Sequence, residues 1–177
     1  VENAVDLLEQ AVLRCLERAG LAIADVDVLV VASTSGIAAP SLDALLVERL
    51  EMRRTVQRLP IFGLGCAGGV IGMARAGALA RAMPGANVVF AVVELCGLTF
   101  RFKDRSKSNV IATALFGDGA AAAVVNTEMS GPELFAWGEH TWPDTLEIMG
   151  WRIEDDGFGV LFSRDIPNLV RSKMRHA

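Results

Sequence analysis

Two apolar runs, Val28-Leu-Val-Val-Ala32 and Val88-Val-Phe-Ala-Val-Val93, decide the fold class. Both are rich in β-branched residues and lack the alternation of a half-exposed strand, so each predicts a strand buried on both faces, as in parallel sheets. Apolar residues recur at helical spacing over 3–19, where Gly20 ends the helix, and a leucine-rich helix is predicted after Pro40. This alternation of helices and strands predicts a layered α/β domain with a largely parallel sheet.

The rest of the chain continues the pattern and then changes in texture. We expect a strand over 56–62, a sharp turn over 65–69, a helix over 67–82, an exposed basic loop over 100–109, a tight turn at 117–119, a strand over 119–126, strands at 133–139 and 157–163, and a helix beginning near Pro167. The three tryptophans all lie beyond Glu128. We therefore predict a division into 1–128 and 129–177.

The composition excludes several classes of protein. The 177 residues are 52% hydrophobic and carry a net charge of −4, which argues against intrinsic disorder and nucleic-acid binding. Arg75, Arg81 and Pro84 interrupt the richest apolar stretch, so no membrane span is predicted. The first residues show no secretory leader, and the three cysteines are too few and too far apart for a disulfide framework or a metal site. We expect a cytoplasmic protein with reduced thiols.

Cys66 is the strongest candidate for a chemical role. It lies in Gly63-Leu-Gly-Cys-Ala-Gly-Gly69, between a predicted buried strand and a predicted helix. The macrodipole and the free N–H groups of a helix N-terminus favour a thiolate and can stabilise an oxyanion on a bound thioester. The alternative is a buried structural cysteine, the commonest fate of a free thiol, and position alone leaves the two readings open. Cys15 is predicted to be core, and Cys96 either core or pocket wall.

The remaining polar candidates are weaker. Asp118 between two glycines is interpreted as a turn residue rather than as a metal or phosphate ligand. The basic loop is interpreted as solvated rather than as a site for an anionic substrate. His140 is predicted to be a surface histidine, and His176 lies too close to the end to be a candidate.

Four blocks together resemble the type III polyketide synthases, the chalcone and stilbene synthase group of the thiolase superfamily. They are Val30-Val-Ala-Ser-Thr-Ser-Gly36, Gly65-Cys-Ala-Gly-Gly69, Val92-Val-Glu-Leu-Cys-Gly-Leu-Thr-Phe100 and Ala114-Leu-Phe-Gly-Asp-Gly-Ala-Ala-Ala122. Their order and spacing match the family. Gly157-Phe-Gly-Val-Leu-Phe-Ser-Arg-Asp-Ile-Pro167 resembles the opening of the family's second half. The third block is more similar to bacterial members than to plant ones.

The resemblance implies a fold, a chemistry and a set of residues. The fold would be the thiolase-like α-β-α arrangement, with most of the first half and the start of the second. Cys66 matches the nucleophile that takes a starter acyl group from coenzyme A before condensation with malonyl-CoA and cyclisation. The residues that match positions shaping the family's cavity are Thr34, Ser35, Cys96, Thr99 and the gatekeeper Phe116. Acyl-CoA and malonyl-CoA would be substrates, with no further cofactor and no metal.

Further positions suggest the size of the pocket and the oligomeric state. Val160 falls where many members carry a second gatekeeping phenylalanine, and Phe158 is two residues away. Ala39 falls where a residue usually reaches across a homodimer interface. Small groups at Val160 and Ala39 would suit a roomier acyl pocket.

The resemblance also carries departures and rivals. Family members are about twice as long, their catalytic His and Asn lie in the second half, and the basic residues that hold the CoA phosphates lie upstream of the matching region. We therefore expect either a piece of a longer enzyme or a degenerate form. The rivals are a fatty-acid type III ketoacyl synthase relative and a non-catalytic scaffold that dimerises without chemistry.

Overall fold

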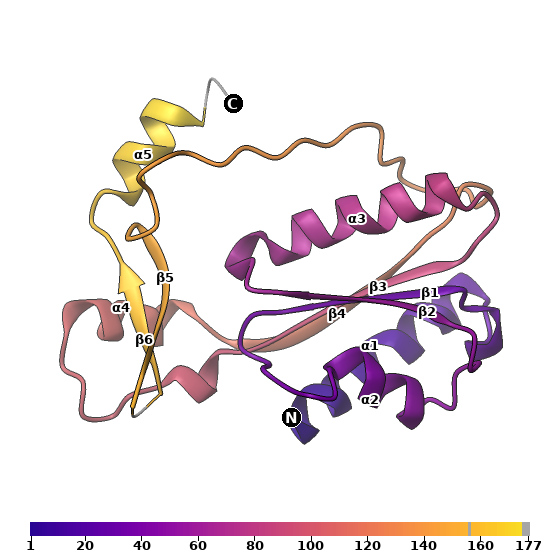
Figure 1. The fold of residues 1–177 in the computed structure, drawn as a ribbon, viewed down its shortest axis with the longest axis horizontal. Coiled ribbons are helices and arrows are strands. Elements are labelled where there is room, and N and C mark those ends of the chain that lie inside the picture. The colour runs from indigo at the N-terminus through magenta and orange to yellow at the C-terminus, as the bar shows by residue number, and fades with distance from the viewer. Residues whose placement is uncertain (156, 175–177) are drawn as a thin grey trace. The chain divides into compact units, whose positions relative to one another are not determined.

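The computed structural model describes residues 1–155 and 157–174 (Figure 1). The chain divides into two compact units. The sheet unit comprises Val1–Leu95 and Asp118–Trp137, and the hairpin unit comprises Cys96–Gly117 and Gly138–Ala177. The division predicted at residue 128 concerns the halves of a longer family fold, and it stays a prediction.

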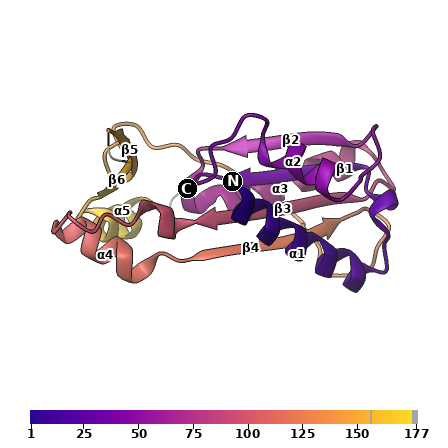
Figure 2. The same ribbon diagram turned by 90° about the horizontal axis from the view of Figure 1, so that it is seen from below.

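The sheet unit is built on a four-stranded sheet of order β2-β1-β3-β4 (Figure 2). Strands β1 (Val28–Ser33), β2 (Gln57–Phe62) and β3 (Val88–Leu95) are parallel. Strand β4 (Asp118–Val125) pairs antiparallel with β3. The positions of the predicted strands and the largely parallel sheet are confirmed. The burial predicted for the strand that ends near Phe62 is wrong, because β2 lies at the edge of the sheet and is mostly exposed.

Helices cover both faces of this sheet, which explains why its two central strands, β1 and β3, carry continuous apolar runs (Figure 1). Leu29 and Val31 pack with α1 (Glu2–Ala19) and α2 (Leu42–Arg49), whereas Val28 and Val30 pack beneath α3 (Gly68–Ala82). All six residues of β1 are buried. The layered α-β-α arrangement is therefore confirmed, and a short helix η1 (Ile23–Asp25) joins α1 to β1.

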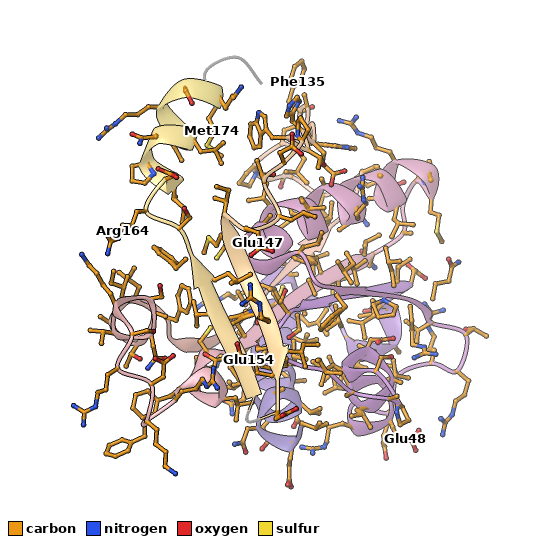
Figure 3. The ribbon with its side chains drawn as sticks, turned by 60° about the vertical axis from the view of Figure 1, so that its left-hand side comes forward. Glu48, Phe135, Glu147, Glu154, Arg164 and Met174 are labelled. Carbon is orange, nitrogen blue, oxygen red and sulfur yellow. The ribbon has the colours of Figure 1, made fainter. Side chains whose placement is uncertain are left out.

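The hairpin unit contains η3 (Cys96–Thr99), α4 (Lys107–Leu115), the antiparallel strands β5 (Met149–Glu154) and β6 (Gly157–Phe162), and α5 (Ile166–Lys173). The strand predicted at 157–163 and the helix predicted near Pro167 are confirmed. Figure 3 shows the hairpin side chains, with Glu147 just before β5 and Glu154 at its end.

Three further sequence predictions are wrong. The basic loop predicted over 100–109 ends early, because Ser106 caps α4 by accepting a hydrogen bond from the N–H of Asn109 at 3.2 Å. Residues 117–119 form no tight turn, because Asp118 and Gly119 already pair with β3 as the first residues of β4. The unpredicted strand β5 takes the place of the one expected at 133–139.

The segment expected to be a strand at 133–139 instead packs on α3. A Cβ added to Gly77 would lie 3.3 Å from both Leu134 and Trp137, so this glycine makes room for them. The Arg81 guanidinium lies 4.5 Å from the centre of the Trp137 ring and donates to the carbonyls of Leu134 and Phe135. Packing against a helix has replaced strand pairing.

Three further observations concern membrane spans, metal sites and the histidines. Within 1–155 and 157–174, no helix is long and apolar enough to cross a membrane. The same residues contain no group of three or more side chains suited to a metal ion. His140 is exposed and lies 4.8 Å from the ring of Trp142, as expected of a surface histidine, whereas His176 lies outside the described residues.

Candidate functional site

Cys66 is exposed and lies directly before α3, in the short helix η2 (Gly65–Ala67). The chain reverses between β2 and η2 through Gly63 at φ +85° and Gly65 at φ +54°, which are conformations that side chains with a Cβ rarely adopt. The Ala67 N–H donates to the Leu64 carbonyl at 3.2 Å. These bonds and glycines place the thiol at the N-terminus of a 15-residue helix, the location that the sequence predicted.

Thr34 holds the loop that carries Cys66. It follows β1, the strand next to β2, and its Oγ1 accepts a hydrogen bond from the Gly65 N–H at 2.8 Å. Its side chain is largely buried, as is that of Ser35. Because parallel strands end at the same edge of a sheet, the ends of β1 and β2 bring these residues together. The structure thus unites Thr34, Ser35 and Cys66 in the sheet unit.

Glu94, near the end of β3, joins this group, although the sequence analysis did not single it out. Its carboxylate accepts hydrogen bonds from the backbone N–H groups of Thr34 at 2.8 Å and Ser35 at 2.9 Å. It also accepts one from the Ser35 hydroxyl at 2.5 Å. The Ser35 Oγ in turn accepts from the Leu95 N–H at 2.8 Å. The half-buried carboxylate therefore fixes the turn that follows β1.

The other predicted site residues lie in the hairpin unit. Phe116 follows α4, and its ring makes edge contacts with Trp151 at 5.9 Å and Phe162 at 6.5 Å between centroids. Val160 pairs directly with Trp151, and the rings of Phe158 and Trp151 lie 6.1 Å apart. Phe116, Phe158 and Val160 thus share one apolar cluster, to which sequence reasoning did not assign Trp151.

The remaining two candidates are in η3. Thr99 is buried, and its hydroxyl donates to the Cys96 carbonyl at 2.7 Å. Cys96 is half-buried at the first position of η3, which leaves open whether it is core or pocket wall. Cys15 is half-buried on α1, and desolvation raises the pKa of its thiol above the ordinary value. A raised thiol pKa suits the structural role predicted for Cys15.

The basic loop is only partly solvated. Lys103, Arg105 and Lys107 are exposed, as predicted. Arg101 differs, because its guanidinium pairs with Glu154 at 2.6 Å and its side chain is only 18% exposed. That ion pair ties the segment before α4 to the hairpin.

Comparison with known proteins places this geometry in a family. The family described as chalcone and stilbene synthases, N-terminal domain, matches residues 1–129. The chain belongs to the chalcone and stilbene synthases. This confirms the resemblance seen in the four sequence blocks.

Individual relatives of this chalcone and stilbene synthase chain agree with that assignment. A 1,3,6,8-tetrahydroxynaphthalene synthase of Streptomyces peucetius is 44% identical over 95% of the chain. A putative chalcone synthase of Bacillus subtilis is 41% identical over 81%, and a type III polyketide synthase C of Arabidopsis thaliana is 31% identical over 96%. The chain covers 46%, 42% and 46% of these proteins, so it spans about half the length of the curated relatives it matches.

Solved structures show the same fold. Germicidin synthase from Streptomyces coelicolor, a type III polyketide synthase, matches 98% of the chain and 46% of its own length with a TM-score of 0.92 at 31% identity. The 1,3,6,8-tetrahydroxynaphthalene synthase of the same species matches 96% and 49% with a TM-score of 0.90 at 30% identity. The predicted thiolase-like fold is therefore confirmed.

Proposed function

We propose that this chain carries the nucleophile and part of the cavity of a type III polyketide synthase. In this proposal Cys66 takes an acyl group from an acyl-CoA starter, and malonyl-CoA extends that group. The resulting polyketide then cyclises to an aromatic or pyrone product. The observation that carries the proposal is the exposed Cys66 thiol at the N-terminus of α3, on a loop held by the Thr34 hydroxyl. This exposure argues against the alternative in which Cys66 is a buried structural cysteine.

The chemistry follows from this position. The Cys66 thiolate attacks the thioester carbonyl of the starter, the carbonyl electrons move to oxygen, and the coenzyme A thiolate leaves when the carbonyl re-forms. Malonyl-CoA then loses CO₂, and its enolate carbon attacks the Cys66 thioester and displaces the thiolate. The N-terminus of α3 stabilises the negative charge on the Cys66 sulfur both before it attacks the starter and after the condensation displaces it. The His and Asn that the family uses for decarboxylation are proposed to come from outside the matching half.

The hairpin unit is proposed to shape the acyl cavity. Phe116, Phe158 and Val160 present one apolar cluster with Trp151, a surface suited to a hydrocarbon chain or a nascent ring. The names of the bacterial relatives support an aromatic product related to tetrahydroxynaphthalene. A homodimer is part of the proposal because of the residue matched at Ala39. The relatives reported above do not favour the ketoacyl synthase rival.

Intact-mass spectrometry tests the proposal. The protein at its natural length is incubated with a medium-chain acyl-CoA, and we expect one acyl adduct that Cys66→Ala abolishes. Cys15→Ala is the matched control, since Cys15 is half-buried, and it should keep the adduct. Malonyl-CoA should then discharge the adduct into a polyketide. An adduct that survives Cys66→Ala, or a wild-type protein that takes none, would overturn the assignment.

A further inference from the structure

We infer that Glu94 is the positioning residue for Cys66: its carboxylate holds the turn after β1, and through Thr34 that turn holds the loop that carries the nucleophile. The inference rests on the proposed function only in taking Cys66 as the nucleophile. Glu94 lies on β3, and Cys66 follows β2. These two strands flank β1 in the sheet. The connection therefore runs across three strands.

The first link is the grip of Glu94 on the turn. Both carboxylate oxygens are used: Oε1 by the Thr34 N–H and Oε2 by the Ser35 N–H and hydroxyl. Hydrogen bonds to an ionised acceptor are shorter and stronger than those between neutral groups. Ser35 is then fixed from a second direction by the Leu95 N–H. The backbone of Thr34 is thus held on both sides of its peptide.

The second link passes from Thr34 to the nucleophile loop. Its hydroxyl accepts from the Gly65 N–H at 2.8 Å, one residue before Cys66. Gly65 lies in the left-handed region and has no Cβ to restrict its backbone, so an external bond is needed to fix it in one conformation. The Thr34 hydroxyl supplies such a bond and keeps Cys66 in line with the N-terminus of α3.

The hydrogen-bond donors around Glu94 require a side chain with two accepting oxygens at this position. Glutamine has the same shape, but its amide nitrogen donates and cannot accept. In Glu94→Gln one of the oxygens that now accept becomes an NH₂ facing N–H groups, so at least one bond to the turn is lost. The turn loosens, and with it the Gly65 loop.

Alkylation of Cys66 by iodoacetamide measures this effect without any acyl-CoA. The readout is the pH profile of the rate, followed by peptide mass spectrometry at Cys66. We expect Glu94→Gln and Thr34→Val each to lower the rate near neutral pH about tenfold, because the thiolate is no longer held at the helix N-terminus. Thr34→Ser keeps the hydroxyl and should restore most of the rate.

The direction of the rate change separates positioning from a direct effect of charge. Removing a negative charge near a thiol would by itself favour the thiolate and raise the alkylation rate near neutral pH. A faster rate in Glu94→Gln, or an unchanged rate, overturns the inference. Asp27→Asn is the matched control, since it removes a carboxylate that accepts a backbone N–H before β1, at the opposite end of the strand. An equal loss in Asp27→Asn would also overturn it.

A double variant tests whether the two links act in series. If Glu94 acts on Cys66 only through Thr34, then Glu94→Gln with Thr34→Val should be no slower than the slower single variant. Multiplied effects would contradict a single connection. Because no acyl-CoA is used, a protein that alkylates as expected but takes no acyl adduct would refute the proposed function and leave the role of Glu94 intact.

Discussion

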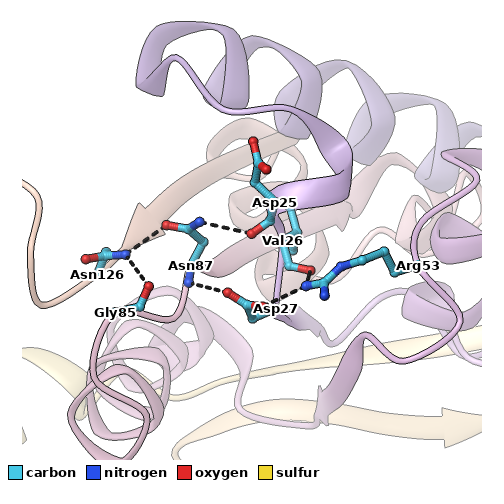
Figure 4. Close-up of polar contacts among 7 residues, drawn as sticks. All are labelled: Asp25, Val26, Asp27, Arg53, Gly85, Asn87 and Asn126. Atoms are coloured by element: carbon cyan, nitrogen blue, oxygen red, sulfur yellow. Dashed lines mark hydrogen bonds and ion pairs between the residues drawn. The ribbon is translucent and has the colours of Figure 1, made fainter.

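The two ends of the parallel strands in the sheet unit each carry a carboxylate that accepts backbone N–H groups, and they use it differently. At the amino end, Asp27 accepts from the Asn87 N–H at 2.9 Å and pairs with Arg53 at 2.6 Å (Figure 4). At the carboxyl end, Glu94 accepts from Thr34 and Ser35. One set of bonds joins strands to one another, and the other ends on a loop with an exposed thiol.

The amino end forms a network that spans the sheet. The Asn87 amide donates to the Asp25 carbonyl at 2.9 Å, and the Asn126 amide donates to the Asn87 side chain at 2.8 Å and to the Gly85 carbonyl at 3.1 Å. These residues flank β1, β3 and β4, so each bond ties two segments distant in sequence (Figure 4). Changes here should cost stability, whereas changes at the carboxyl end should also alter the reactivity of Cys66.

The largest effect is expected where α3 rests on the sheet. A Cβ added to Gly72 would lie 2.4 Å from the buried Phe90 ring, so Gly72→Ala forces α3, the helix that follows Cys66, away from β3. We expect a loss of about 3 kcal/mol in the free energy of unfolding, measured by urea denaturation. Gly69→Ala is the control, because nothing lies within 4 Å of its added Cβ, and it should stabilise the helix by about 0.5 kcal/mol. Similar effects of the two variants would show that α3 does not pack on Phe90 as described.

A pair of equivalent glycines sharpens the comparison of the two ends. Gly65 at φ +54° precedes Cys66, and Gly85 at φ +82° belongs to the amino-end network. Alanine at either position should cost about 1–2 kcal/mol of stability, because a Cβ disfavours the left-handed region. A Cβ on Gly85 would also lie 3.1 Å from the flexible Glu128 carboxylate, whereas nothing lies within 4 Å of one on Gly65.

Reactivity should distinguish this pair where stability does not. Only Gly65→Ala displaces the N–H that Thr34 accepts, so only Gly65→Ala should slow iodoacetamide labelling of Cys66. The measurement is the labelling rate of Cys66 in each variant, under conditions in which the protein stays folded. If Gly85→Ala slowed labelling as much, the two ends would be coupled, and the separation of stability from reactivity would be wrong.

The sheet could be predicted from sequence because its signals are local and strong. The apolar runs at 28–32 and 88–93 are buried on both faces, and helical spacing over 3–19 matches α1. Cys66 could be placed because glycines surround it between a strand and a helix. These features need no knowledge of which segments meet.

The errors lie where distant contacts decide the structure. Glu94 was overlooked because the strand was expected to end at Val93 and because its partners lie about 60 residues away. Strand β5 was missed because Met149-Gly-Trp-Arg-Ile-Glu154 is weakly apolar and is held by pairing with β6. Its alternation of Met149, Trp151 and Ile153 was the signal that could have placed Trp151 beside Val160. Residues 133–139 have strand-like composition, but Leu134 and Trp137 pack against α3 instead of pairing with a strand.

The smallest effect, and the one that isolates the amino end, is the response of Asp27 to acid. Hydrogen bonds from the Asn87 N–H and from Arg53 lower the pKa of this carboxyl below its ordinary value of 3.8. A group whose pKa is lower in the folded state stabilises the protein above its unfolded pKa, and that contribution is lost as the pH falls through the folded value. Asp27 should therefore contribute fully at neutral pH and progressively less below about pH 4.

Asp27→Asn should remove this dependence. The side chain is 36% exposed, so solvent screens the interaction, and we expect a loss of about 1 kcal/mol at pH 7 that shrinks toward zero below pH 3. Urea denaturation across this pH range provides the measurement. Glu48→Gln is the control, since the Glu48–Arg54 pair is 72% and 82% exposed and should show no such change. A constant difference between Asp27→Asn and wild type down to pH 3 would mean that the Asn87 N–H is bound by shape rather than by charge, and the two ends would then differ in the chemistry of their acceptors as well as in what they hold.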